Sequence, residues 1–440
     1  MKKILGACKT NFVEPSDCPK YVGQIIKVNG IIHKIREMSG FSFVILRTKK
    51  NLIQCVFEAG DANPHPPLCE GCAVIIEGEV SADERAVNGY ELHIKNVEIL
   101  AQPAEPLPVV INKKRLNLSL DTNLNFRPIS LRNPIERAIF KVQEGIVRGF
   151  REFLFKQRFT EIRSPKIVFA GAEGGANVFR LEYFGRQVFL AQSPQFYKQM
   201  MVGVYERVFE VAPVFRAEKH NTSRHLNEYI SMDFEMGFIE SVYDIMDMET
   251  GALKHISQLL RAEYQDELNL LGAKIPVFEE IPAIKFKEAK EIIASAYQRR
   301  ITDWYDFDPE EEKLICQYVL NHYNSEFVFI THYPSRKRPF YAKDDPADPE
   351  YTLSFDLLFR GLEITTGGQR IHDYHEQVAK MQKRGMNPED FEPYLMIHKY
   401  GIPPHGGLGI GLERLTMKIL NLDNVRHACL FPRDMERVTP

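Results

Sequence analysis

The chain has 440 residues, of which 44% are hydrophobic and 26% are charged, and its formal net charge is −3. This length predicts two or three domains, and the near-balanced charge excludes a protein that is basic throughout, so any nucleic-acid surface must be a local patch. No apolar stretch is long enough for a membrane span or a secretory signal, and the seven scattered cysteines favour a reducing compartment, so we expect a cytoplasmic protein.

The first predicted domain covers residues 1–104. Between residues 20 and 102, apolar and polar residues alternate in four or five short runs that turn residues separate. This pattern predicts a small closed β-barrel. Residues 105–132 contain several prolines and show no hydrophobic periodicity, which predicts a linker or hinge.

The second predicted domain covers residues 133–440 and opens with a helix. Asn133 can cap this helix, Pro134 suits its first turn, and apolar residues then recur at steps of three and four. Short strands and loops among helices follow, which predicts an α+β domain with a largely antiparallel sheet. Residues of about 265–350 fit this pattern less well, and we treat them as an insertion.

A hairpin is predicted at residues 214–236, VFRAEKHNTSRHLNEYISMDFEM, with a turn near residues 220–223. It would present Arg216, Glu218, Arg224 and His225 on one polar surface, which suits a polyanion with a heterocycle, such as a nucleotide. The alternative is a hairpin whose charges pair with one another on a solvated face, and the hairpin alone does not decide between them.

Two carboxylates, Asp356 and Glu363, lie on a strand-like run that ends in Thr366, Gly367 and Gly368. Oxygen ligands of this kind can hold magnesium and share it with a substrate phosphate. Arg370 follows and could grip a carboxylate with two hydrogen bonds.

Two further stretches are candidates for binding. The glycines of PPHGGLGIGLER enter a helix that carries Arg414, and free amides at such an entry can bind an anion. The polar run AQSPQFYKQ contains Gln195 and Lys198, although Ser193 before Pro194 would equally cap an ordinary surface helix. Taken singly, each structural explanation is as good as its functional one.

Taken together and in order, FTEIRSP, FRAE…RHLNEY and GIGLER resemble the three signature motifs of class II aminoacyl-tRNA synthetases. AEGG, QSPQFYKQ, RAEKHNTSRHLNEY, TTGGQR and the terminal LFPRD are most similar to aspartyl-tRNA synthetases of the archaeal and eukaryotic type. The resemblance implies an antiparallel sheet with flanking helices, an N-terminal OB-fold barrel that binds the anticodon, and a homodimer formed through the first motif. Pro165 in that motif suits a sheet edge or a subunit interface.

The resemblance also assigns roles to residues, with ATP and magnesium as cofactors. Arg216 and Arg414 would be catalytic, Tyr229 and Arg414 would sandwich the adenine, and magnesium would lie on Asp356, Glu363 and Thr366. The implied ATP-binding set is Arg216, Ala217, Glu218, Arg224, His225, Leu226, Tyr229, Glu363, Gly411, Leu412, Glu413 and Arg414.

For the amino acid, Lys198 and Arg370 favour L-aspartate, because two cations in a small pocket suit a carboxylate and a neutral amide would leave them unpaired. The implied aspartate-binding set is Glu173, Gln195, Phe196, Tyr197, Lys198, Arg216, Thr366 and Arg370. The alternatives are an asparaginyl-tRNA synthetase, an RNA-independent asparagine synthetase, and a non-catalytic synthetase-like tRNA-binding protein.

For the RNA, the resemblance implies that His33, Phe43, Gln54 and Val87 contact the anticodon, with Phe43 as a stacking platform. Members restricted to tRNA(Asp) tend to have tryptophan near His33 and lysine near Val87. Their absence favours a relaxed enzyme that charges tRNA(Asn) as well as tRNA(Asp) with aspartate.

Overall fold

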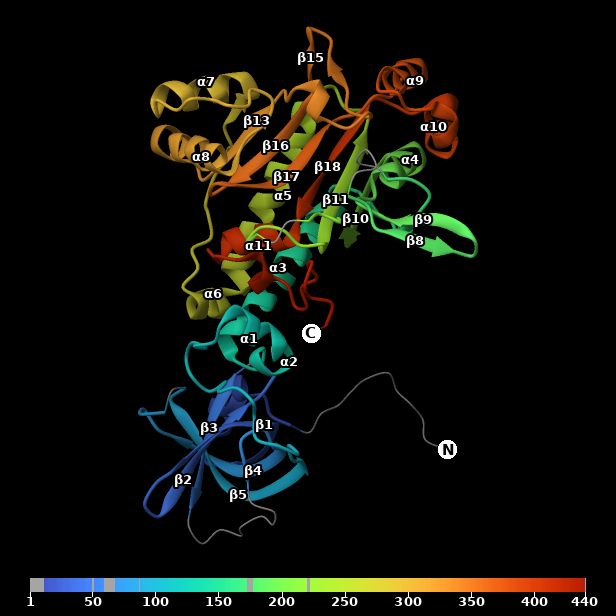
Figure 1. Ribbon diagram of the computed structural model, residues 1–440. Coiled ribbons are helices and arrows are strands. Elements are labelled where there is room, and N and C mark those ends of the chain that lie inside the picture. Colours follow the sequence, from blue (N-terminus) through green and yellow to red (C-terminus); the bar gives the residue numbers. More distant parts are fainter. Residues whose placement is uncertain are drawn as a thin grey trace. The chain divides into compact units, whose positions relative to one another are not determined.

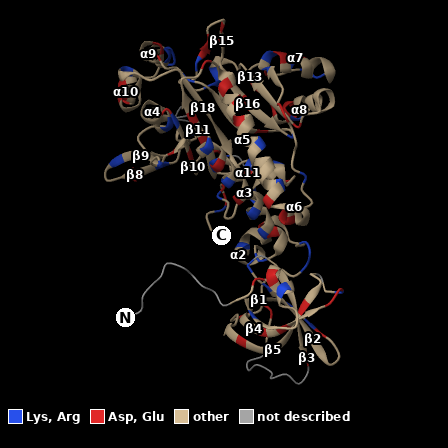
Figure 2. Ribbon diagram, turned by 180° about the vertical axis from the view of Figure 1, so that it is seen from behind, with Lys and Arg blue, Asp and Glu red and all other residues tan. Residues whose placement is uncertain are grey.

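The computed structural model describes residues 12–49, 51–58, 68–86, 88–171, 177–219 and 222–439 (Figure 1). The chain forms two compact units, which divide between Pro134 and Ile135. In the described part of the chain, no helix combines the length and the apolar character that a membrane crossing requires. Lys and Arg are interspersed with Asp and Glu along the ribbon (Figure 2).

The first unit contains the predicted closed barrel. Its strands follow the order β1-β2-β3-β5-β4, and β1 closes the barrel by pairing with both β2 and β4. Side chains alternate between the buried interior and the surface along β4, which explains the alternation in the sequence. The bounds are β1 (Ile25–Glu37), β2 (Phe41–Arg47), β3 (Leu52–Glu58), β4 (Ala73–Ala82) and β5 (Tyr90–Ala101), preceded by η1 (Pro15–Tyr21).

The predicted linker is partly helical, with α1 (Leu120–Asn125) and α2 (Arg127–Ser130). Ser119 caps α1 by accepting a hydrogen bond from the Thr122 amide. Arg127 is fully buried and donates to the Asn123 side chain, which Ser130 also contacts. Polar contacts rather than an apolar stripe stabilise these short helices, so hydrophobic periodicity could not predict them.

The second unit is built on an eight-stranded sheet of order β12-β13-β16-β17-β18-β11-β10-β6. Its inner pairs are antiparallel, and only the two edge pairs, β12 with β13 and β10 with β6, are parallel. The predicted hairpin is β10 paired with β11. The bounds are β6 (Thr160–Glu161), β10 (Arg207–Phe215), β11 (Glu228–Gly237), β12 (Ala283–Lys285), β13 (Phe327–Thr331), β16 (Ser354–Phe359), β17 (Leu362–Gln369) and β18 (His405–Gly411).

The predicted long helix is α3 (Pro134–Lys156), which packs with α5 (Val242–Glu263) in the main hydrophobic core. Gly145 permits this close packing, because a Cβ there would lie 2.7 Å from a Leu260 methyl group. The remaining elements are β7 (Ile167–Val168), β8 (Arg180–Tyr183), β9 (Arg186–Leu190), α4 (Gln195–Tyr205), α9 (Tyr374–Lys383), η3 (Pro388–Phe391), α10 (Glu392–Tyr400), α11 (Leu412–Ile419) and η4 (Val425–Ala428).

Residues 265–350 are not an insertion separate from the domain. They supply β12 and β13 to the main sheet, and a buried cluster joins them to β16 through Leu358. These strands have three and five residues, too short for the sequence pattern to connect them with the rest of the sheet. The other elements here are α6 (Gln265–Leu271), α7 (Phe286–Ala296), α8 (Pro309–Tyr323), η2 (Ser335–Lys337), β14 (Asp344–Asp345) and, ending just beyond, β15 (Asp348–Thr352).

Candidate active site

A cavity of about 660 Å³ in the second unit gathers most of the predicted site residues. Its lining comes from α4, β11, β17, β18 and α11 and from the loop between β10 and β11. The predicted residues that line it are Gln195, Lys198, Arg216, Glu218, Arg224, His225, Leu226, Tyr229, Glu363, Thr366, Arg370, Gly411, Glu413 and Arg414.

Several predicted residues lie elsewhere. The Phe196 ring packs among aromatic side chains that include Phe340 and Tyr394, and Leu412 belongs to the main core, so neither side chain lines the cavity. Asp356 is buried beside the lining residue Arg338. Ala217 and Tyr197 are also not lining residues, and Glu173 lies outside the residues that the structure describes.

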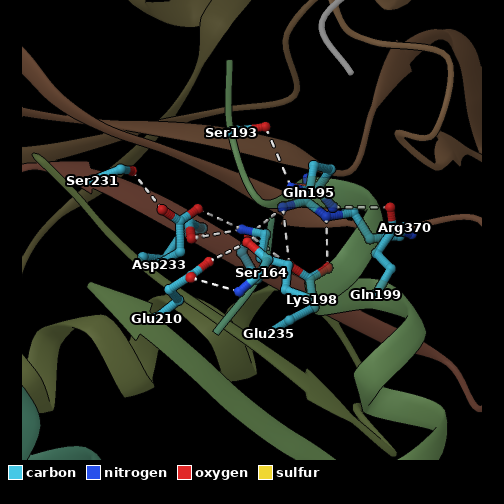
Figure 3. A network of polar contacts seen from close by, with 12 residues as sticks. Ser164, Ser193, Gln195, Lys198, Gln199, Glu210, Ser231, Asp233, Glu235 and Arg370 are labelled. Carbon is cyan, nitrogen blue, oxygen red and sulfur yellow. Dashed lines mark hydrogen bonds and ion pairs between the residues drawn. The ribbon is translucent and has the colours of Figure 1, made fainter. Parts of the chain in front are cut away.

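Lys198 lies at the centre of a buried polar network (Figure 3). Its side chain is 2% exposed, and its Nζ lies 3.0 Å from Asp233 Oδ1 and 3.3 Å from Glu235 Oε2. It also donates a hydrogen bond of 2.9 Å to the Leu408 carbonyl oxygen. Gln195 precedes it on α4 and donates to the Gln199 side chain.

Arg370 joins the same network from the other side (Figure 3). Its Nε donates to Glu235 Oε1 at 2.9 Å, and its Nη2 donates to the Gly407 carbonyl oxygen at 2.9 Å. Burial alone would raise the pKa of Glu235, but the charges of Arg370 and Lys198 outweigh it and lower that pKa. Two cations are therefore matched by two carboxylates, Asp233 and Glu235.

This pairing corrects the argument from sequence that an amide substrate would leave Lys198 and Arg370 without partners. Both cations already have buried carboxylate partners. The sequence did contain a signal for those partners, because Asp233 and Glu235 alternate with apolar residues along β11. That alternation placed them on one face without showing what they faced.

The glycine-rich stretch also differs from expectation. Its glycines form β18, whose backbone pairs with β11 on one side and β17 on the other, so it is not a loop of free amides. A Cβ at Gly407 would lie 2.1 Å from a backbone oxygen and 2.2 Å from the Glu235 carboxylate. The lack of side chains here makes room for the buried polar network.

Cations surround the part of the cavity beside the β10–β11 loop. Arg216 Nη1 lies 3.8 Å from Glu218 Oε1, and the Arg216 guanidinium lies 5.7 Å from the centre of the Tyr229 ring. His225 Nε2 lies 3.8 Å from Glu218 Oε2, while its Nδ1 contacts the Thr222 hydroxyl at 2.6 Å. These contacts bring the side chains of Arg216, Glu218 and His225 together at one end of the cavity.

Two further arginines, Arg224 and Arg414, line the same part of the cavity, and each lies near a glutamate. Arg224 pairs with Glu312 of α8 at 3.0 Å, and Arg414 Nη1 lies 3.8 Å from Glu363 Oε1. Burial raises the pKa of Glu312 to about 7, against the lowering effect of Arg224. Glu312 was not among the predicted site residues, because it lies in residues 265–350, which the sequence pattern sets apart as an insertion.

Asp356 and Glu363 lie on the neighbouring strands β16 and β17, and the charge of Glu363 acts on Asp356. Burial and the charge of Glu363 raise the pKa of Asp356, although Arg338 lies 2.8 Å from Asp356 Oδ2. Glu363 Oε1 accepts a hydrogen bond from the Thr366 hydroxyl. Among the described residues, no group of three or more His, Cys, Asp or Glu could hold a metal ion. A metal bound at Asp356 and Glu363 would therefore take further ligands from a substrate or from water.

In the barrel, Phe43 and Gln54 lie on one face of adjacent strands, because Phe43 pairs with Val56 and Ile45 with Gln54. Gln54 donates to the Glu91 carboxylate, and Phe43 packs edge-on against a neighbouring phenylalanine. His33 occupies the bulge in β1. Its side chain is only 5% exposed, so it offers little surface to a binding partner. Val87 lies outside the described residues.

Comparison with known families gives two matches. Residues 119–435 match the description "tRNA synthetases class II (D, K and N)", and residues 26–100 match "OB-fold nucleic acid binding domain". The first match spans the main sheet and the whole cavity lining, and the second spans the barrel.

Individual relatives cover nearly the full chain. The "Aspartate--tRNA(Asp/Asn) ligase" of Deinococcus radiodurans is 46% identical over 430 residues, which are 96% of this chain and 98% of the relative. The "Aspartate--tRNA(Asp) ligase" of Pyrococcus abyssi is 39% identical over 425 residues, covering 95% and 97%. Among solved structures, asparaginyl-tRNA synthetase from Pyrococcus horikoshii complexed with asparaginyl-adenylate has a TM-score of 0.90 at 30% identity, covering 98% of this chain and 99% of that one. A putative aspartyl-tRNA synthetase from Leishmania major has a TM-score of 0.86 at 30% identity, covering 97% and 94%.

Proposed function

The chain belongs to the class II tRNA synthetases of the D, K and N group, and we propose that its cavity activates L-aspartate with ATP and transfers it to tRNA. Aspartate ligation agrees with the name of a relative that is 46% identical over nearly the whole chain. One observation carries the assignment of the site. The cations Arg216, Arg224 and Arg414 line the same cavity as the buried network around Lys198.

The reaction joins two anions, so it depends on positioning and on neutralising charge. The aspartate α-carboxylate attacks the α-phosphorus of ATP, the bond to the bridging oxygen breaks, and pyrophosphate leaves. Arg216 would hold the α-phosphate, and Arg224 with His225 would hold the terminal phosphates. Tyr229 and Arg414 would enclose the adenine. The substrate side chain would rest against Lys198 and Arg370 at the buried network.

The carboxylate pair fits a magnesium ion that it shares with ATP. Asp356 and Glu363 repel each other across adjacent strands, and a divalent cation would relieve that repulsion. When bound, magnesium would neutralise phosphate charge. Glu363 and Thr366 would orient it, while Arg338 holds Asp356 in place.

A second subunit would cover α3. Phe155 at the end of this helix is 54% exposed, and a shallow apolar hollow beside it is also lined by Phe140, Val147 and Leu430. The short strand β6, which belongs to the first motif, lies at an edge of the main sheet, where a second subunit could reach it. Sedimentation of the wild type and of Phe155→Asp tests this, since a wild-type monomer would exclude the dimer.

We further propose relaxed RNA specificity, because the chain has His33 rather than tryptophan in the first barrel strand. Relatives described as acting on tRNA(Asp/Asn) and on tRNA(Asp) both align over nearly the full chain. Charging of purified tRNA(Asp) and tRNA(Asn) transcripts with aspartate is the test. Comparable rates are expected, and a tRNA(Asn) rate lower by about a thousandfold, the scale of strong discrimination, would refute the proposal.

A further inference from the structure

One wall of the cavity has no role in binding ATP or aspartate as proposed above. It is formed by Arg336 and Lys337 of η2 together with Arg384, which follows α9. All three side chains are exposed and carry positive charge. The neighbouring Arg338 is different, because it is mostly buried and its charge is matched by Asp356.

The guanidinium of Arg336 stacks on an aromatic ring. Its guanidinium carbon lies 3.5 Å from the centre of the Tyr305 ring, so one face of the guanidinium is covered by an aromatic ring. Tyr305 lies in the segment between α7 and α8 and is 44% exposed. A guanidinium plane held in this way can stack on a nucleobase with its other face.

Arg384 is hydrogen-bonded to the backbone of this wall. Its Nη1 donates a hydrogen bond to the Arg338 carbonyl oxygen and its Nη2 donates one to the Ser335 carbonyl oxygen, at 2.6 and 2.7 Å. These bonds fix the backbone on both sides of Arg336 and Lys337. Arg384 therefore acts as a positioning residue as well as a fixed charge.

Lys337 supplies an exchangeable charge. Its Nζ lies 3.1 Å from Asp306 Oδ2 and 3.8 Å from Asp303 Oδ2, and all three side chains are well exposed. Surface pairs of this kind are weak, so a phosphate can replace the carboxylates.

Aspartate transfer requires a third anionic substrate in this cavity. The 3′-terminal ribose of tRNA must reach the aspartyl-adenylate, and the end of that strand is unpaired, with alternating phosphates and bases. Proteins bind such strands with cations beside stacking platforms. We propose that Arg336 and Lys337 bind the single-stranded 3′ end of tRNA. Arg336 is stacked on Tyr305, and Arg384 holds the backbone of both residues in place. The inference rests on the proposed function and assigns the partner of one wall of the same cavity.

The double variant Arg336→Ala/Lys337→Ala tests the proposal. Aspartate-dependent ATP–pyrophosphate exchange needs no tRNA and should stay within about twofold of wild type, whereas kcat/KM for aspartylation of tRNA should fall about tenfold or more. Lys287→Ala/Lys383→Ala is the matched control, since it removes two exposed lysines that do not line the cavity. This control should leave both activities unchanged.

A truncated tRNA that lacks its last two nucleotides locates the contact. Truncation should weaken binding to the wild type but not to the double variant, because the variant has already lost the contact. Equal losses of exchange and aspartylation, unchanged aspartylation, or an equal effect of truncation on both proteins would each overturn the inference. Absence of aspartate-dependent exchange in the wild type would overturn the proposed function itself, and with it this inference.

Discussion

The guanidinium of Arg224 and the carboxylate of Glu312 form a two-contact ion pair, with Nη1–Oε2 at 3.0 Å and Nη2–Oε1 at 3.4 Å. The pair ties the loop between β10 and β11 to the first turn of α8. Arg224 is therefore held at the cavity wall before any phosphate arrives. Glu312 is mostly buried, and burial raises its pKa to about 7, so its charge is easily changed near neutral pH.

This pair predicts proton uptake on ATP binding. Whether Arg224 leaves Glu312 for a phosphate or the phosphate simply approaches, the pKa of Glu312 must rise further. At pH 7.5 the wild type should therefore take up a fraction of one proton, at most roughly three quarters, that Glu312→Gln does not. Calorimetry of ATP binding in buffers of different ionisation enthalpy measures the difference. Glu310→Gln, in the same turn but exposed, is the control, and identical proton uptake in wild type and Glu312→Gln would contradict the prediction.

Replacing Lys198 should disable the amino-acid pocket. Lys198→Met leaves Asp233 and Glu235 buried with Arg370 as their remaining cation, and losing one partner of a buried pair costs about 3–5 kcal/mol. Aspartate-dependent exchange should fall by about a hundredfold or more, and urea unfolding should show reduced stability.

A suitable control is Lys166→Met, because Lys166 pairs with the buried Glu210 at 3.0 Å and does not line the cavity. It should lower stability and spare exchange. If Lys198→Met kept normal exchange, the network would have no part in binding the amino acid.

Glu249 of α5 should make stability fall as pH rises. It is fully buried beneath the sheet, and burial, with a contribution from Asp356, raises its pKa to about 8. The folded state therefore keeps a proton that the unfolded state loses, and between about pH 4.5 and 8 this group lowers the free energy of unfolding by up to about 1.4 kcal/mol per pH unit. Urea unfolding of Glu249→Gln should match wild type near pH 4.5 and exceed it increasingly up to pH 8. A difference that does not change with pH would contradict the prediction.

The barrel should contribute RNA affinity without affecting amino-acid activation. Phe43→Ala removes the proposed stacking platform, and the loss of one stacked base lowers affinity by about 5- to 150-fold. Filter binding with tRNA transcripts measures this loss, while ATP–pyrophosphate exchange should stay at the wild-type level. A parallel loss of exchange would mean that the substitution damages the whole protein.

Much of the fold could be predicted because the elements carry strong local periodicity. The barrel strands, α3 and the β10–β11 hairpin alternate or repeat over enough residues to be recognised. Strands β12 and β13 are too short for this, and their place in the main sheet depends on contacts with distant β16. The helices α1 and α2 depend on polar contacts of Arg127 and Asn123, which no hydrophobic pattern reveals.

The candidate site shows the same limit. The motifs identified the cations Arg216, Lys198 and Arg370, but a motif does not record which distant carboxylate each cation meets. Glu312 and Glu235 become visible as partners only once the chain is folded. These partners change the chemistry at Lys198 and Arg370, because Asp233 and Glu235 balance two charges that sequence alone left unmatched.

The most direct test of the account is ATP–pyrophosphate exchange by the purified protein with aspartate or asparagine as the only amino acid. Arg216→Ala serves as the blank, because it removes the proposed contact with the α-phosphate. The account predicts exchange with aspartate that exceeds exchange with asparagine by at least about a hundredfold and is abolished in the variant. Exchange with asparagine alone, or with neither amino acid, would contradict it.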